Sequence, residues 1–291
     1  MKKFLLLFFV SLACQLSGQD TLPRADTTRL WQVITVDGNE YFGKILDRNS
    51  EELRLKTEAL GVITIQVKNL KSIKEIRPEL VVEGELWSEN PQATRYFWAP
   101  NGYGLKGGEG YYQNLWVFFN QVSVGITDNA SIGFGIVPLF LFGGAPTPVW
   151  ITPKVSVPVV ENKFNLGAGA LIGTVLGEDT GGFFGIAYGV STFGSRDKNF
   201  NIGLGYGFAG GEWARTPTIN LSAMIRIGRK GYLLTENYYI DAGGTAFGLL
   251  SLGGRTVWGN VALDYGGFIP AGDVGTLVVV PWLGITVSFG R

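Results

Sequence analysis

The stretch Phe200-Asn201-Ile202-Gly203-Leu204-Gly205-Tyr206-Gly207-Phe208 decides the fold class. Large apolar side chains occupy every second position, and asparagine or glycine stands between them. A repeat of two is the period of a β-strand, in which successive side chains point to opposite faces of the sheet. The stretch therefore predicts a strand with one bulky, apolar face and one small, polar face.

The same alternation recurs along the second part of the chain and predicts a β meander rather than helices. Further alternating segments are residues 116–127, 131–136, 151–159, 164–173, 184–190 and 219–227. The connections between segments alternate between short tight turns and longer loops rich in Gly, Pro or Thr. They delimit eleven segments, and a twelfth strand near residues 94–103 would give the even number that outer-membrane barrels have.

The two faces of these strands indicate what surrounds them. One face consists of Gly, Ser, Asn and Ala, with too few charged side chains to solvate the outside of a soluble barrel. The opposite face is rich in aromatic and branched side chains, which are too bulky to fill the inside together. We therefore expect the bulky face to contact lipid and the small, polar face to line a lumen, as in transmembrane β-barrels.

The last predicted strand has one apolar face, formed by Leu283, Ile285, Val287 and Phe289. Together with the alternation above, it makes residues 93–291 resemble a bacterial outer-membrane β-barrel protein. Members of that class end on a strand that the barrel-assembly machinery reads, usually with the aromatic residue last, whereas here Gly290 and Arg291 follow. The resemblance implies an all-β, antiparallel transmembrane barrel of about 12 strands, with the outer-membrane lipid bilayer and the assembly machinery as partners.

The first third of the chain has a different composition. Residues 20–92 hold 23 charged side chains in 73 positions, whereas residues 93–291 hold 23 in 199. Lys2 and Lys3 precede an apolar run of 10 residues, which is typical of a secretory signal peptide. The expected organisation is a signal peptide at 1–18, a small periplasmic β domain at 25–78, a linker at 79–92 and the barrel at 93–291.

The small domain is expected to contain five short strands between residues 30 and 76. A turn at Asp37-Gly38-Asn39 follows the first strand, and a polar break at Lys68-Asn69 precedes the last. This spacing resembles an SH3-like or Sm-like small β-barrel. Its role stays open between a module without a ligand and one that binds a periplasmic peptide or envelope component.

Composition excludes several functions. The 24 Lys+Arg balance the 24 Asp+Glu, which argues against a nucleic-acid partner, because phosphates require a basic surface. The chain has no histidine and one cysteine, Cys14, which removes the usual hydrolase nucleophile pairs and zinc sites. The glycines at 102, 104 and 107 have dinucleotide-motif spacing, but no helix is expected after them. We therefore expect no enzyme activity, cofactor or metal.

Five charged residues are expected in or near the lumen. Lys154, Arg226, Arg255 and Asp264 fall on the small-residue face, whereas Glu236 shares its face with Leu234, Tyr238 and Ile240. A bulge at Glu236, or a wrong register, would explain that conflict. Two interpretations of these charges remain open: a charged constriction in a pore, or a buried ion-pair network that fills the barrel.

The dipeptide Gly259-Asn260 predicts a two-residue hairpin turn. Closing that turn pairs Trp258 with Val261 and places Arg255 directly opposite Asp264 on the inner face. The leading functional expectation is a passive channel or transport-type barrel for small solutes in the cell outer membrane, with the N-terminal domain in the periplasm. The alternative is a structural or adhesion-type envelope protein with a filled barrel and no flux.

Overall fold

The computed structural model describes most of the chain in two compact units, Met1–Leu86 and Trp87–Arg291. The described residues are 25–76, 78–82, 85–87, 89–177, 182–241, 246–271 and 278–290. The expected signal peptide, with Cys14, lies outside them. Each unit is described by itself.

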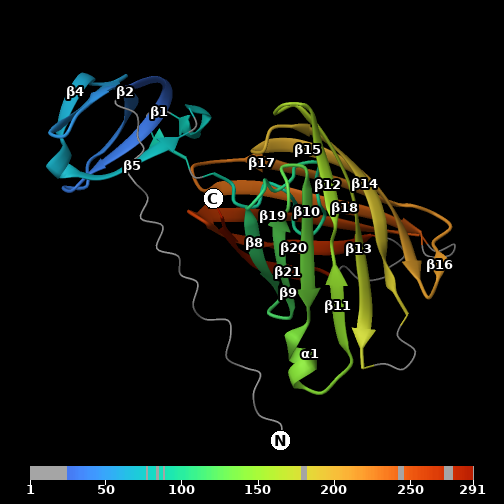
Figure 1. Ribbon diagram of the computed structural model, residues 1–291. Coiled ribbons are helices and arrows are strands. Elements are labelled where there is room, and N and C mark those ends of the chain that lie inside the picture. Colours follow the sequence, from blue (N-terminus) through green and yellow to red (C-terminus); the bar gives the residue numbers. More distant parts are fainter. Residues whose placement is uncertain are drawn as a thin grey trace, which may run out of the picture. The chain divides into compact units, whose positions relative to one another are not determined.

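The N-terminal unit contains an antiparallel sheet of five strands in the order β4-β3-β2-β1-β5 (Figure 1). The strands are β1 (Asp26–Thr35), β2 (Glu40–Arg48), β3 (Glu52–Thr57), β4 (Gly61–Gln66) and β5 (Leu70–Ile76). A 3-10 turn, η1 (Val67–Asn69), stands at the predicted polar break. Trp31, Val33, Ile45 and Leu55 are in the buried core. The five strands agree with the expectation, whereas the resemblance to an SH3-like or Sm-like barrel stays a prediction.

Short elements follow this sheet. They are η2 (Pro78–Leu80) and a two-stranded sheet of β6 (Val81–Val82) and β7 (Glu85–Leu86). The division between the two compact units comes directly after β7.

The C-terminal unit is a closed antiparallel β-barrel with twelve wall strands (Figure 1). The strands are β8 (Gly110–Leu115), β9 (Phe119–Gly125), β10 (Ala130–Ile136), β11 (Thr147–Ile151), β12 (Lys154–Val160), β13 (Phe164–Leu176), β14 (Phe184–Gly194), β15 (Lys198–Ala209), β17 (Thr218–Arg226), β18 (Gly231–Asp241), β19 (Ala246–Trp258), β20 (Val261–Ala271) and β21 (Val280–Phe289). Strands β11 and β12 form one interrupted wall strand, because both pair with β10 and β13. The barrel closes where β21 pairs with β8.

The two ends of the barrel differ. The short-turn end carries the connections 126–129, 161–163, 195–197, 227–230 and 259–260. The long-loop end carries α1 (Pro138–Phe142), β16 (Glu212–Trp213), which pairs with β15, and the longer connections. Among the described residues, no helix is long and apolar enough to cross a membrane.

The expected strand at residues 94–103 is wrong, although the barrel has twelve strands. Residues 94–103 form turns and one isolated bridge, and β8 takes the twelfth place in the wall. Strand β8 was not predicted, because the alternation in residues 116–127 was interpreted as a single strand. The chain instead reverses at Trp116 and Val117, which adopt φ values of 47° and 68°. Such turns normally use Gly or Asn, so the sequence carried no turn signal there.

Most wall strands point their bulky side chains outward. Exposed large apolar residues on this outer face include Val122, Phe134, Val157, Leu166, Ile202, Leu204, Leu221, Leu252 and Ile285. The opposite face is buried and carries small polar residues, among them Ser123, Ser156, Asn165, Asn201 and Ser222. The predicted assignment of faces therefore holds for these strands.

Two strands, β14 and β18, have the opposite orientation. In β14, Val190 is buried inside and Gly189 is exposed outside. In β18, Leu234 and Glu236 are both buried inside, so no bulge is needed at Glu236. The rule that bulky residues face outward is wrong here, because apolar groups also fill part of the interior.

The hairpin formed by β19 and β20 has the predicted register. Trp258 pairs with Val261 across the Gly259-Asn260 turn, and Arg255 pairs with Asp264. Gly259 has a φ of 58°, a conformation that suits glycine in a tight hairpin. The turn thus fixes which side chains meet inside the barrel.

Candidate functional site

The barrel interior is partly filled by the chain itself. Residues 89–105, called the plug from here on, run through the lumen before β8. Gln92, Tyr96, Phe97 and Asn101 in this segment are completely buried. Tyr96 and Phe97 pack with inward-facing apolar side chains of the wall, namely Leu115, Met224, Leu234, Val257, Phe268 and Trp282. A segment expected to be a wall strand is therefore the core of the barrel.

Arg255 and Asp264 form a bidentate ion pair inside the barrel. The Arg255 Nε lies 2.5 Å from Asp264 Oδ1, and its Nη2 lies 2.9 Å from Oδ2. The two side chains are 0% and 1% exposed. Arg255 also donates to the plug carbonyls of Gln92 and Tyr96, at 2.6 and 2.7 Å. The pair therefore holds the plug backbone as well as joining β19 to β20.

Glu236 binds the plug from a different strand. Its Oε2 accepts hydrogen bonds from the backbone N–H groups of Trp98 and Ala99, each at 2.9 Å. Its Oε1 accepts a hydrogen bond of 2.8 Å from the Tyr238 hydroxyl. The carboxylate thus satisfies two plug donors that have no strand partner, which makes its complete burial tolerable.

Lys154 holds the plug on the far side of the barrel. Its ammonium group donates to the carbonyls of Tyr103 and Thr94, at 2.5 and 3.3 Å. The Gly102 N–H donates to Thr192 Oγ1 at 2.7 Å, so two wall strands fix this part of the plug.

Arg226 lies at the short-turn end of the barrel. It forms an ion pair of 3.1 Å with Asp197 at the short-turn end and lies over the rings of Trp87 and Tyr232. Three of the five predicted charges, Lys154, Glu236 and Arg255, therefore bind the plug backbone directly. Asp264 pairs with Arg255 and also lies 3.8 Å from Arg95 of the plug, whereas the ion pair of Arg226 is at the short-turn end.

The sequence interpretation missed the partners of these charges. Arg95 of the plug donates to Gln92 Oε1 at 2.5 Å and to Thr286 Oγ1 at 3.1 Å, and it lies 3.8 Å from Asp264. A signal was present, because the triplet at 100–102, Pro-Asn-Gly, is a turn sequence that a wall strand does not tolerate.

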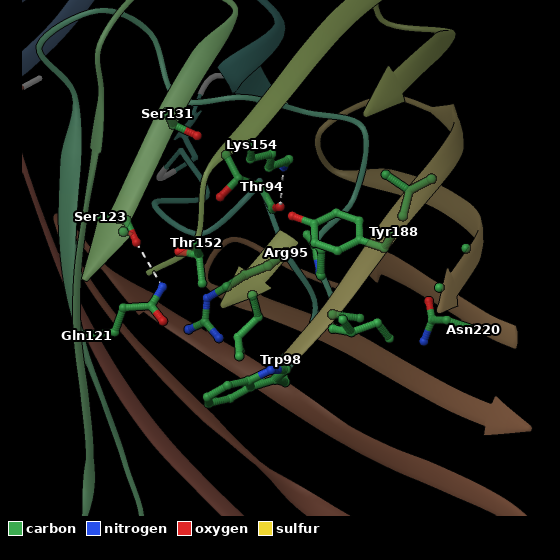
Figure 2. A pocket seen from close by; sticks show the side chains of 18 of the residues that line it. Thr94, Arg95, Trp98, Gln121, Ser123, Ser131, Thr152, Lys154, Tyr188 and Asn220 are labelled. Atoms are coloured by element: carbon green, nitrogen blue, oxygen red, sulfur yellow. Dashed lines mark hydrogen bonds between the residues drawn. The ribbon is translucent and has the colours of Figure 1, made fainter. Parts of the chain in front are cut away.

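Beside the plug lies a cavity of about 390 Å³ (Figure 2). Polar side chains from β9, β10 and the β11–β12 wall strand lie on one side of it, including Gln121, Ser123, Ser131 and Lys154. Apolar side chains line much of the rest, including Leu171, Ile186, Val190, Ile240 and Leu249, with Thr218 and Asn220 of β17 among them. The reversed strands β14 and β18 supply three of these five apolar residues. In the part of the chain that the structure describes, no group of His, Cys, Asp or Glu could hold a metal ion.

We expect substitution of Gly102 by alanine to displace the plug from the barrel wall and so to destabilise the barrel. A Cβ atom at Gly102 would lie 2.5 Å from the Asn165 carbonyl oxygen and 2.8 Å from its carbon, which are backbone atoms of β13. Overpacking of this kind costs about 1–3 kcal/mol. Gly189→Ala is the matched control, because no atom lies within 4 Å of its added Cβ. Thermal unfolding measures the effect, and equal melting temperatures for the two variants would contradict the described plug position.

The site belongs to a class: a closed β-barrel whose lumen is divided between a plug and a cavity. No family model and no curated protein matches the sequence. A solved structure described as "CymD monoaromatic hydrocarbon channel" is similar, with 9% sequence identity and a TM-score of 0.36. The similarity covers 90% of this chain and 87% of that one. So distant a likeness carries no argument about the function of this chain.

Proposed function

We propose that this protein is an outer-membrane β-barrel that acts as a passive channel for small solutes. The exposed belt of apolar side chains around the barrel supports a membrane location, because a soluble protein rarely exposes such a continuous apolar surface. The plug joins the wall at the short-turn end, where the Ser288 hydroxyl donates to the Pro91 carbonyl. Short turns are periplasmic in such barrels, which supports a periplasmic N-terminal domain.

The observation that carries the channel function is the divided lumen. The cavity holds space of the size that small ligands occupy, about 300–1,000 Å³. The plug is attached to the wall by side-chain contacts and forms a single β-bridge within itself. A segment held in this way can shift without breaking the hydrogen-bonded wall, and its movement would connect the cavity to both ends.

A filled barrel without flux is the second candidate, and the buried ion network favours it. Arg255, Asp264 and Glu236 are all completely or almost completely buried against the plug. If these contacts never break, the plug always fills the barrel, and the protein has a structural role in the cell envelope. The two candidates differ in permeation and not in fold.

Permeation through reconstituted protein separates them. We expect proteoliposomes with the wild-type protein to swell in small solutes, and Ser131→Trp to lower the rate at least fivefold, because Ser131 lines the cavity. Ser191→Trp is the matched control, since Ser191 pairs with Leu166 and Ile202 and shares their outer face. A wild-type protein that is folded but does not conduct would overturn the channel and leave the filled barrel.

Membrane location is tested separately by cell fractionation and by gel migration with and without boiling. We expect the protein in the outer-membrane fraction, with a shift in migration on boiling. A soluble protein whose migration does not change would contradict the membrane barrel.

A further inference from the structure

Lys154 differs from the other described lumen cations in lacking a carboxylate partner. Arg255 is paired with Asp264, Arg226 with Asp197, and Arg95 lies 3.8 Å from Asp264. The acceptors of Lys154 among the described residues are two neutral carbonyls. An ammonium group has three N–H donors, and a low-dielectric interior strengthens its attraction to an anion. Among the described residues, no carboxylate therefore balances the positive charge of Lys154, which borders the cavity.

Hydroxyl groups lie in the same cavity as Lys154. Figure 2 shows the side chains of Ser131, Thr152 and Tyr188 in the same cavity as Lys154. Within the described residues, no side-chain hydrogen bond is formed by any of these three hydroxyls. Each hydroxyl can donate one hydrogen bond, so this side of the cavity can surround an oxyanion with donors.

Much of the cavity lining suits an apolar molecule, although Thr218, Asn220 and Tyr238 add polar groups to it. Leu171, Ile186, Val190, Ile240 and Leu249 offer no hydrogen bonds, and burying polar groups against them would cost free energy. A ligand that satisfies Lys154 with its hydroxyl neighbours and also the apolar residues has one anionic group and an apolar body. A phosphate or a sugar would leave most of its polar groups facing this apolar wall.

We infer that the lumen cavity binds a small monocarboxylic acid with an apolar body, its carboxylate on Lys154 and its body against β14 and β18. This inference rests on the proposed channel and names the class of solute that it admits. It also gives Lys154 two roles, because the same ammonium group holds the carbonyls of Thr94 and Tyr103 in the plug.

Equilibrium binding of hexanoate and hexan-1-ol to the full mature protein in nanodiscs tests the inference, with Trp98 fluorescence as the signal, since Trp98 lines the cavity. We expect the wild-type protein to bind hexanoate at least tenfold more tightly than hexan-1-ol. Lys154→Met keeps the apolar stem and removes the charge, so hexanoate should weaken at least tenfold while hexan-1-ol is unchanged.

Two controls keep the test decisive. Lys154→Arg retains the charge and should keep hexanoate binding, which guards against loss of binding through a displaced plug. Lys198→Met removes an exposed lysine and should leave both affinities unchanged. Equal wild-type affinity for the acid and the alcohol, or unchanged hexanoate binding by Lys154→Met, would overturn the inference. Binding without permeation would overturn the channel alone, and permeation without preference for the acid would overturn only this inference.

Discussion

Replacing Asp264 by alanine is expected to destabilise the barrel by about 3–5 kcal/mol, the usual cost of leaving a buried charge without its partner. The guanidinium of Arg255 is completely buried and would lose both bonds of a bidentate pair. Arg255→Met should cost a similar amount, because the buried Asp264 carboxylate loses its bidentate partner and keeps, among the described residues, only Arg95, at 3.8 Å. The double variant should cost clearly less than the sum of the two single variants.

A double-mutant cycle on urea unfolding in lipid vesicles measures this coupling, which we expect at about 1–3 kcal/mol. The ion pair between Arg29 and Glu75 provides the matched control. Its atoms lie 2.8 Å apart, but the side chains are 57% and 50% exposed. Exposed pairs are typically worth about 0–1 kcal/mol. Additive effects at Arg255 and Asp264 would show that the pair is not buried together as described.

Replacing Glu236 by alanine is expected to release the plug. Two backbone donors, at Trp98 and Ala99, would lose a charged acceptor, and hydrogen bonds to charged groups contribute about 1.5–3 kcal/mol each. Even about 3 kcal/mol in total raises the released population roughly a hundredfold. Glu236→Gln should have an intermediate effect, since its amide nitrogen donates where an acceptor is needed.

The rate at which a water-soluble maleimide labels Ala93→Cys reports plug release, because Ala93 is 1% exposed. The labelling rate should rise with Glu236→Ala and stay unchanged with Glu212→Ala, which removes an exposed carboxylate at the long-loop end. Labelling at the wild-type rate in Glu236→Ala would mean that other contacts alone hold the plug.

The sequence could predict the parts of the fold that follow from local chemistry. Period-two alternation identified the wall strands, and the Gly259-Asn260 turn placed Arg255 opposite Asp264. The alternation and the turn dipeptide both lie within a few residues of the strands and the residue pair that they predict. The five strands of the N-terminal unit were accessible for the same reason.

The plug could not be predicted in this way, because its partners are distant in sequence. Tyr96 donates to Asn199, and Arg95 donates to Thr286, so neither contact leaves a local pattern. The reversed faces of β14 and β18 follow from the same limit. Val190 and Leu234 point inward because they pack there against residues that are distant in sequence. Alternation alone does not distinguish the inner face from the outer face.

The seam between β8 and β21 has a consequence for how the protein is assembled. This seam consists of six residue pairs, from Gly110 with Phe289 to Leu115 with Gly284. It joins the two ends of the barrel unit. Closing it therefore has the entropy cost of closing a loop of nearly the whole unit. The plug directly precedes β8, and Ser288 of β21 donates to its Pro91 carbonyl.

Pairing of β21 with β8 therefore completes the wall and the core in one event. Contacts between β21 and the plug offset part of the entropy cost of joining the ends. A chain in which β21 has not yet paired has neither a closed ring nor a fully held interior.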